Sequence, residues 1–309
     1  MAESPTPHDH LFQALLEDPH RAGILLREQL PAEVAERMTD APPQLEEGSF
    51  VDDELRPTRS DRLFTAGLKD GRSAFFYVLL EHKSEPDPRT PIQLLGYMSR
   101  IWERYAGQDR ERLRHLPPIM PLVIYHGRQP WNVAQSVLDC IDADPVILAL
   151  QQDFRYAVQP LRDQPYEALS ADPAVRSALG ALAHVFDREV DAATLARIFR
   201  DAPDWDTLEH RILAYIAQTF PTTQEAFDAA LTQSKPERRE DLTMTVAEEW
   251  RQEGKQEGEA TMLIRLVERR FGEGAADPYR GQIEAADAQT LLRWFDQGLS
   301  AQTLNEVFQ

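Results

Sequence analysis

The sequence predicts an α/β protein that is followed by an all-helical carboxy-terminal region. Two β-rich runs separated by a glycine turn, residues 59–68 and 73–83, indicate a hairpin. A helical repeat over residues 92–107 and a β-branched apolar run over residues 118–127 come next, which is typical of a strand–helix–strand crossover. From about residue 166 onward the apolar spacing is helical only.

The composition is that of a globular protein with a sizeable core. Of the 309 residues, 42% are hydrophobic. The longest apolar run, AFFYVLL, is far shorter than the roughly 18 to 20 residues that span a bilayer. The amino terminus, MAESPTPHDH, lacks the basic and apolar parts of a signal peptide, so we expect a cytoplasmic protein with no membrane partner. The single cysteine, Cys140, rules out an internal disulfide and a zinc site built from thiolates.

The charge is acidic overall but unevenly spread. A net charge of −19 argues against a nucleic-acid partner, because phosphate binding depends on Lys and Arg. Residues 56–128, however, carry thirteen basic and eight acidic side chains, whereas the segments on either side are acidic. A basic surface for DNA and ordinary variation along a solvated surface both explain this contrast.

The remaining elements before residue 166 follow from local patterns. Residues 8–30 have the apolar spacing of a helix that breaks near Asp18, and residues 31–38 predict a second, short helix. The prolines and glycine of APPQLEEGS predict a loop. A further strand is expected over residues 154–161.

The register of the hairpin decides which side chains share a face of the sheet. A two-residue turn would put Asp61 and Glu81 on opposite faces. A three-residue loop over residues 69–71 has glycine at its left-handed position, pairs Leu68 with Arg72 and brings Asp61 and Glu81 to one face. We expect the three-residue loop.

An acid in one strand followed by Glu-x-Lys at the exit of the next indicates phosphodiester hydrolysis. Asp61 and Glu81 would hold Mg²⁺, or alternatively Mn²⁺ or Ca²⁺, through hard oxygen ligands, and Lys83 would orient the attacking water. The side chain of His82 points away from Glu81, but its backbone carbonyl is a candidate metal ligand. The pattern alone is common by chance, so its position on a hairpin before a crossover helix is what favours a catalytic site.

An ordered series of motifs runs along nearly the whole chain: HDHLFQALLEDP, SDRLF, LLEHKSEPD, LLGYMSRIWERY, LPPIMPLVIYHGRQPW, EGKQEGEATMLIRLVERRFG and LNEVF. This series resembles the Rpn family of recombination-promoting nucleases, also called YhgA-like putative transposases, within the PD-(D/E)XK nuclease superfamily. The resemblance implies a mixed central sheet flanked by helices, and a metal-dependent DNA endonuclease.

By this resemblance Asp61 matches the metal-binding acid, Glu81 the second acid and Lys83 the final lysine. Many relatives have glutamine in place of that lysine, so this chain is closer to the superfamily pattern, which favours a competent site. Asp9, in the HD motif, matches a helical acid that would complete the metal shell.

The helix after the site carries the candidate substrate contacts. Gln93 and Tyr97 would touch phosphate or substrate, although relatives often have arginine where this chain has Gln93. Arg100, with other arginines such as Arg104, would provide a basic edge for DNA. An ordinary solvated helix surface is the alternative.

The carboxy-terminal region predicts a long helix and two short ones. Gly254 and Gly258 share a face of the long helix, over residues 240–272, which favours close approach of another helix in a homo-oligomer or within the chain. A frayed, polar helix end is the alternative. The last helix is expected to be capped by Ser300. The chain is therefore expected to comprise a nuclease-like domain, a helical region and a helical extension: residues 1–165, 166–235 and 236–309.

Other interpretations stay open beside the nuclease. Asp9 would serve only to cap the first helix. His8 and His10 beside it would indicate an HD-type metal phosphohydrolase, although no second histidine and aspartate set is evident. The same fold would also serve as a non-catalytic DNA- or protein-binding module. A transposase with three acids on another fold is disfavoured because Lys83 has no role there.

Overall fold

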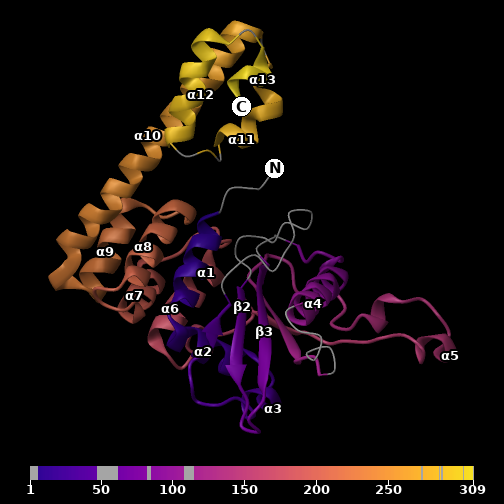
Figure 1. Ribbon diagram of the computed structural model, residues 1–309. Coiled ribbons are helices and arrows are strands. Elements are labelled where there is room, and N and C mark those ends of the chain that lie inside the picture. Colours follow the sequence, from indigo (N-terminus) through magenta and orange to yellow (C-terminus); the bar gives the residue numbers. More distant parts are fainter. Residues whose placement is uncertain are drawn as a thin grey trace. The chain divides into compact units, whose positions relative to one another are not determined.

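Five strands in the described part of the chain form one sheet, with neighbours in sequence order (Figure 1). The strands are β1 (Gln44–Leu45), β2 (Arg62–Gly67), β3 (Ser73–Glu81), β4 (Ile119–Tyr125) and β5 (Ala157–Pro160). β2 runs antiparallel to β1 and β3, whereas β3, β4 and β5 run parallel to one another. The sheet is therefore mixed, and the α/β class expected from the sequence is confirmed.

The computed structural model describes residues 6–46, 62–81, 85–107, 115–272, 274–284, 286, 288–301 and 303–308. The chain divides into two compact units, one over residues 5–239 and the other including residues 240–309. The sheet lies in the first unit, and all of the predicted site residues fall within the range of that unit.

Helices precede, connect and follow the strands of the first unit. Those that the structure describes are α1 (Pro7–Glu17), α2 (Pro19–Gln29), α3 (Ala32–Ala35), α4 (Thr90–Gly107), α5 (Pro145–Leu148), α6 (Pro173–His184), α7 (Ala192–Asp201), α8 (Thr207–Thr219) and α9 (Gln224–Ser234). α4 connects the parallel strands β3 and β4, so the predicted strand–helix–strand crossover is confirmed.

α4 covers one face of the sheet. Its apolar residues Leu94, Met98 and Ile101 pack in one cluster with strand residues such as Tyr77. Because side chains alternate along a strand, intervening residues such as Phe76 point to the other face, and Phe76 is fully buried. Figure 1 shows α1 and α2 on that other side. Burial of both faces explains why AFFYVLL is apolar without alternation.

A capped break separates α1 from α2. The side chain of Asp18 accepts hydrogen bonds from the backbone N–H groups of His20, at 2.7 Å, and Arg21, at 3.3 Å. Pro19 occupies the first turn of α2, where a missing N–H costs nothing. The break predicted near Asp18 is therefore confirmed.

Two expectations before β2 need correction. The predicted loop APPQLEEGS contains β1, in which Gln44 pairs with Thr65 and Leu45 pairs with Phe64. A two-residue strand is too short for an alternating pattern to reveal it. The helix expected over residues 31–38 is also shorter than predicted, and α3 spans only Ala32–Ala35.

Polar contacts join the helices after the sheet to α2. The Gln29 side-chain amide donates to the carbonyl oxygen of Leu169 at 2.9 Å, in a buried position. The Arg21 guanidinium pairs with the carboxylate of Asp206, which is the N-cap of α8. α6 to α9 therefore belong to the same compact unit as the sheet.

The second unit has a core of its own. Its helices are α10 (Arg239–Phe271), α11 (Arg280–Glu284), α12 (Ala288–Ser300) and α13 (Leu304–Val307). Leu263 and Val267 of α10 pack with Leu291 and Trp294 of α12. Interdigitated apolar side chains on facing helices explain why this unit is compact.

Two predictions concern residues of the second unit: the cap at Ser300, and the close helix approach at Gly254 and Gly258. α12 runs through Ser300, and Thr303 rather than Ser300 is the N-cap of α13, so the predicted cap is wrong. Gly254 and Gly258 lie within α10 as expected. The packing around these two glycines lies outside the described side chains, and their role in close helix approach stays a prediction.

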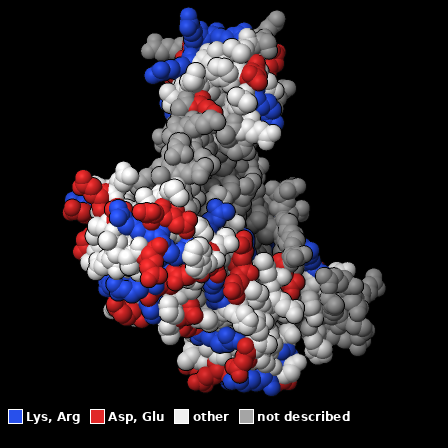
Figure 2. Space-filling view, turned by 90° about the vertical axis from the view of Figure 1, so that its left-hand side faces the viewer, with Lys and Arg blue, Asp and Glu red and all other residues white. Residues whose placement is uncertain are grey.

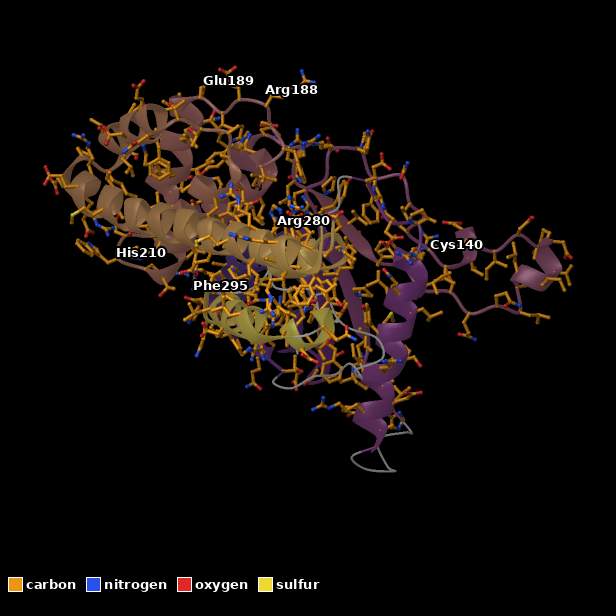
Figure 3. The ribbon with its side chains drawn as sticks, turned by 90° about the horizontal axis from the view of Figure 1, so that it is seen from above. Cys140, Arg188, Glu189, His210, Arg280 and Phe295 are labelled. Atoms are coloured by element: carbon orange, nitrogen blue, oxygen red, sulfur yellow. The ribbon has the colours of Figure 1, made fainter. Side chains whose placement is uncertain are left out.

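The connection from β4 to β5 projects from the sheet and carries α5 (Figure 1) and Cys140 (Figure 3). A bridge between Ser136 and Arg155 closes its base. Cys140, the single cysteine of the sequence, is exposed on this connection.

Candidate active site

The β2–β3 hairpin turns through the three-residue loop that the sequence predicts. The N–H of Leu68 donates to the carbonyl oxygen of Arg72 at 2.7 Å, and the N–H of Gly71 donates to that of Leu68 at 3.0 Å. Gly71 has a φ of 85°, a left-handed conformation that glycine adopts without strain. The ladder continues with Leu63 opposite Tyr77. The predicted register is therefore confirmed over the described part of the hairpin.

The predicted catalytic residues lie at and beyond the end of these strands. Glu81 is the last residue of β3, and Tyr125 of β4 is its backbone partner. The side chain of Glu81 lies outside the described set, as do Asp61, His82 and Lys83. Their convergence on one metal ion therefore stays a prediction. Among the described residues, no three His, Cys, Asp or Glu side chains are grouped so that they could hold a metal ion.

Asp9 lies in the first turn of α1 and is only 4% exposed. Its Oδ2 accepts hydrogen bonds from the N–H of Thr6 at 2.8 Å and from the Thr6 hydroxyl at 2.9 Å. The N–H of Asp9 donates to that hydroxyl at 3.3 Å, which completes a capping box. Asp9 therefore helps to cap α1, with Thr6 as the N-cap residue.

The second carboxylate oxygen of Asp9 has a different environment. Oδ1 is buried and has no hydrogen-bond partner among the described residues. A buried carboxylate oxygen without a donor or a cation costs free energy, so natural structures usually provide one or the other. The capping box thus fixes the orientation of the Asp9 carboxylate, and no described residue uses the lone pairs of its Oδ1.

Gln93, Tyr97 and Arg100 lie on one stripe of α4, because residues three and four apart are neighbours on a helix. Gln93 is exposed, and Tyr97 is half-buried with its ring 5.2 Å from that of Tyr77, measured between centroids. Arg100 is half-buried, and its Nη1 is buried with no hydrogen-bond partner in the described chain. The stripe therefore offers an amide, a phenol and a guanidinium, groups that bind phosphate oxygens.

Two histidines that have no role in the predicted nuclease site meet beside the end of β4. His126 directly follows Tyr125 and is fully buried. Its ring centroid lies 5.1 Å from that of His8 on α1 and 5.7 Å from that of Phe186. Nδ1 of His8 is hydrogen-bonded to the hydroxyl of Tyr215 on α8 at 2.8 Å. Tyr215 is 207 residues from His8 in sequence, so no local motif could have linked the two.

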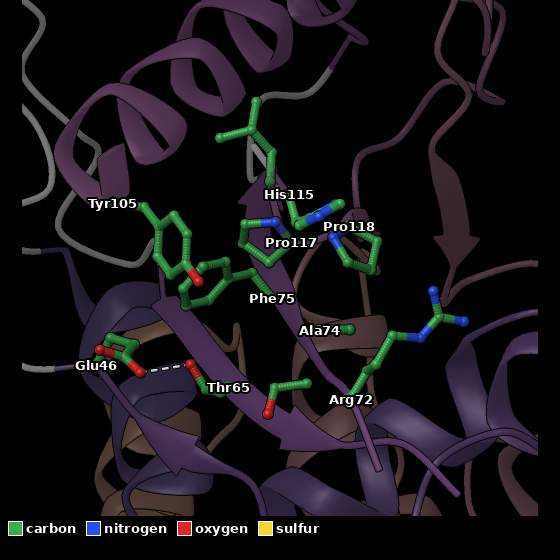
Figure 4. A pocket seen from close by; sticks show the side chains of 11 residues that line it. Glu46, Thr65, Arg72, Ala74, Phe75, Tyr105, His115, Pro117 and Pro118 are labelled. Atoms are coloured by element: carbon green, nitrogen blue, oxygen red, sulfur yellow. Dashed lines mark hydrogen bonds between the residues drawn. The ribbon is translucent and has the colours of Figure 1, made fainter. Parts of the chain in front are cut away.

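A pocket of about 640 Å³ lies beside the start of β3, at the end of that strand opposite to Glu81 (Figure 4). Phe75 at the start of β3 and Tyr105 near the end of α4 form its aromatic wall, with ring centroids 6.0 Å apart. Glu46 and Thr65, which are hydrogen-bonded to each other, line it as well. Among the site residues whose side chains the structure describes, Asp9, Gln93, Tyr97 and Arg100 do not line this pocket.

The surface shown in Figure 2 mixes the two signs of charge. Lys and Arg side chains are interspersed with Asp and Glu over the described residues of this face. Such a face does not provide the continuous basic strip that a DNA backbone favours. In the described ranges, the structure has no helix with the length and apolar character needed to cross a membrane.

Several known proteins of Escherichia coli are similar in sequence to this chain. Recombination-promoting nuclease RpnD of Escherichia coli O157:H7 is 33% identical over 131 residues, which cover 41% of this chain and 49% of that protein. Recombination-promoting nuclease RpnA of Escherichia coli K12 is 28% identical over 263 residues, covering 82% of this chain and 86% of the relative. A protein of the same strain, named inactive recombination-promoting nuclease-like protein RpnE, is 27% identical over 288 residues, covering 89% and 93%.

No solved structure matches the chain. Residues 6–208, well over half of the chain, match the family model described as "Putative transposase, YhgA-like". The match begins at the N-cap residue of α1 and ends within α8, so it includes the whole sheet. The chain therefore belongs to this YhgA-like family, whose relatives named above include recombination-promoting nucleases.

Proposed function

We propose that the chain is a metal-dependent DNA endonuclease that hydrolyses phosphodiester bonds. The names of RpnA and RpnD support a nuclease that promotes recombination. The description of the family as a putative transposase supports a role in mobile elements, and a role in defence is a further alternative. In this proposal Asp61 and Glu81 are the principal ligands of Mg²⁺, with Mn²⁺ or Ca²⁺ as alternatives. Asp9 and the backbone carbonyl of His82 are further ligands.

The hairpin register is the observation that carries the proposal. Leu63 and Leu79 both belong to the cluster that packs under α4. Asp61 is two residues before Leu63, and Glu81 is two residues after Leu79. Continued alternation along both strands would give the two acids the same face of the sheet. A two-residue turn would have separated them.

The carboxylate of Asp9 fits a hard cation. Its Oδ2 is held in the capping box, and its Oδ1 is buried without a partner among the described residues. Carboxylate oxygens are the ligands that Mg²⁺ prefers in proteins. This combination supports Asp9 as a third acid of the proposed metal site.

The proposed chemistry is a single displacement at phosphorus. A bound Mg²⁺ would polarise the scissile phosphate and lower the pKa of a coordinated water. The ammonium of Lys83 would orient the attacking water and offset the negative charge that develops on the phosphate. The attacking water gives up a proton to solvent and its oxygen forms the new bond to phosphorus. The bond from phosphorus to the leaving sugar oxygen breaks, and that oxygen takes up a proton from solvent.

α4 is proposed to hold the DNA backbone. Gln93, Tyr97 and Arg100 would contact phosphate oxygens, and the half-buried guanidinium of Arg100 has an unpartnered Nη1 among the described residues. The excess of basic over acidic side chains in residues 56–128 supports approach of DNA from this part of an otherwise acidic chain.

The carboxy-terminal helices are proposed to carry self-association. Leu292 and Leu299 are each 58% exposed and lie seven residues apart, on one face of α12. Phe295 of the same helix (Figure 3) is half-buried and packs against the core of the second unit. Exposed apolar stripes on a helix are typical of partner surfaces. Light scattering of the whole chain is expected to give a dimer or larger mass that Leu292→Lys lowers, and a monomeric wild-type chain would contradict the proposal.

Plasmid cleavage tests the proposed activity. Supercoiled plasmid is incubated with the purified chain in Mg²⁺, Mn²⁺ or Ca²⁺, with EDTA as the control. We expect nicked and then linear plasmid in at least Mg²⁺ or Mn²⁺, and none in EDTA, because the metal supplies the charge that the reaction needs. Cleavage that is unchanged by EDTA would contradict the proposal.

A non-catalytic DNA- or protein-binding module is the second candidate function. The relative named as inactive, RpnE, aligns with 89% of this chain, which is the observation that favours this alternative. Such a module would retain plasmid in a gel-shift experiment without cleaving it in any of the three ions. The same incubation therefore distinguishes the two candidates.

A further inference from the structure

Tyr215 connects the helical region to the first turn of α1. It lies on α8, is 2% exposed, and its hydroxyl is hydrogen-bonded to Nδ1 of His8 at 2.8 Å. His8 directly precedes Asp9, the acid whose Oδ1 is buried and unpartnered in the described chain. Tyr215 also lies beyond residue 208, where the match to the family model ends.

We infer that Tyr215 is a positioning residue for Asp9, because its hydrogen bond to His8 fixes the turn of α1 that carries both residues. The inference rests on the proposed metal site, in which Asp9 is a ligand. It adds a residue of the helical region to the support of that site.

The ring of His8 is enclosed by side chains from three segments. Tyr215 of α8 meets it edge-on, with centroids 5.5 Å apart, and His126 after β4 lies 5.1 Å away. Phe186, after α6, is 6.5 Å from it. Close packing on these sides leaves the imidazole little freedom to rotate. The end of β4 and α8 therefore hold the first turn of α1 between them.

The hydrogen bond involves a neutral phenol. Burial raises the pKa of Tyr215, so the hydroxyl stays protonated. Depending on the tautomer of His8, either the phenol donates to Nδ1 or the Nδ1–H donates to the phenol oxygen. Phenylalanine at position 215 removes the hydrogen bond in both cases and keeps the aromatic ring that packs against His8.

The fold of α1 does not depend on this bond. Leu11, Phe12 and Leu15 of α1 are at most 1% exposed, and α1 packs along α8. Thr6 and Asp9 cap the helix independently of His8. Loss of the Tyr215 hydroxyl is therefore expected to loosen the position of Asp9 while the helix stays formed.

Binding of Mn²⁺, followed by electron paramagnetic resonance of the free ion, tests the inference without the need for cleavage. The whole chain is compared as wild type, Tyr215→Phe and Tyr166→Phe. Tyr166 is a matched control, since it is 8% exposed and its hydroxyl donates to Oδ2 of Asp201 at 3.0 Å, away from α1. We expect Tyr215→Phe to bind Mn²⁺ about fivefold more weakly and Tyr166→Phe to bind it as the wild type does.

A double-variant cycle shows whether Tyr215 acts through Asp9. In an Asp9→Asn background the ligand is already lost, so Tyr215→Phe is expected to weaken Mn²⁺ binding no further. If Tyr215→Phe fails to fold, His8→Phe removes the same bond from the other end and is expected to give the same fivefold loss.

The outcomes separate the inference from the proposed function. Equal Mn²⁺ affinity of the wild type and a folded variant lacking this bond would overturn the inference alone. A further loss in the Asp9→Asn background would overturn it as well, because Tyr215 would then act by another route. A wild-type chain that binds no Mn²⁺ would overturn the proposed metal site itself.

Discussion

Two glycines of the first unit have room for a side chain but differ in backbone conformation. An added Cβ at Gly71 or at Gly96 would meet no atom of the described residues within 4 Å. Gly71 has a φ of 85° in the β2–β3 loop, whereas Gly96 lies inside α4. A side chain is strained in the left-handed region but favoured in a helix, so alanine has opposite consequences at the two positions.

We expect Gly71→Ala to lower the free energy of unfolding by about 1 kcal/mol and Gly96→Ala to raise it by about 0.5 to 1 kcal/mol. Urea unfolding of the first unit measures both, since both residues belong to it. Gly71→Asn serves as a control that tolerates the left-handed region and is expected to fall between the wild type and Gly71→Ala. A Gly71→Ala chain as stable as the wild type would speak against the three-residue loop.

Single residues also show what sequence can and cannot predict. Gly71 was predictable because a loop of three residues requires a left-handed position and glycine fills it at low cost. The bond between His8 and Tyr215 was not, because it depends on how α1 and α8 pack. The HD motif drew attention to His8, but nothing local to that motif indicates that its ring meets the ring of His126.

At the scale of helices and strands, charged caps connect elements that are distant in sequence. Asp206 caps α8 by accepting from the N–H of Leu208 at 2.8 Å, and it also pairs with Arg21 of α2. The hydrogen bond from the Arg21 guanidinium, with that from the Leu208 N–H, holds the pKa of Asp206 below its ordinary value of 3.8. The ionised carboxylate therefore contributes stability above about pH 3.8, which is lost as the pH falls through the lower pKa of the folded chain.

Asp206→Asn tests this linkage. Asparagine keeps the cap but removes the charge, so we expect a loss of up to about 1 kcal/mol at pH 7 from the partly exposed pair. Below pH 3.8, the ordinary value, the difference is expected to shrink as the pH falls toward the lower pKa of the folded chain. Urea unfolding at pH 7 and at a series of pH values below 3.8 measures it, with Asp206→Ala as the control that also loses the cap. A difference that stays constant with pH would show that the ion pair contributes nothing.

Elements were predictable where local chemistry is strong. The helix break near Asp18, the crossover through α4 and the long helix α10 all agree with the sequence patterns. β1 was missed because two residues form a strand only through pairing with β2. The Ser300 cap was wrong because α12 continues through that residue, so Thr303 became the cap of α13.

At the scale of the whole molecule, the proposed site would draw on three elements from the amino-terminal part of the first unit. Asp9 comes from α1, Glu81 from the end of β3, and Gln93, Tyr97 and Arg100 from α4. The spacing of these residues predicted the hairpin face and the helical stripe. The support that we infer from α8 for Asp9 was not predictable. The sequence indicates a separate helical region from about residue 166 onward, whereas α8 packs against α1 within the same compact unit.

The central claim is that Asp61 and Glu81 share a catalytic metal ion. Its most direct test is the rate of Mg²⁺-dependent nicking of supercoiled plasmid by the wild type, Asp61→Ala and Glu81→Ala, with circular dichroism to show that each is folded. We expect each folded variant to lose nicking by about a hundredfold or more, because one carboxylate ligand is gone. Nicking by both folded variants at the wild-type rate would contradict the claim.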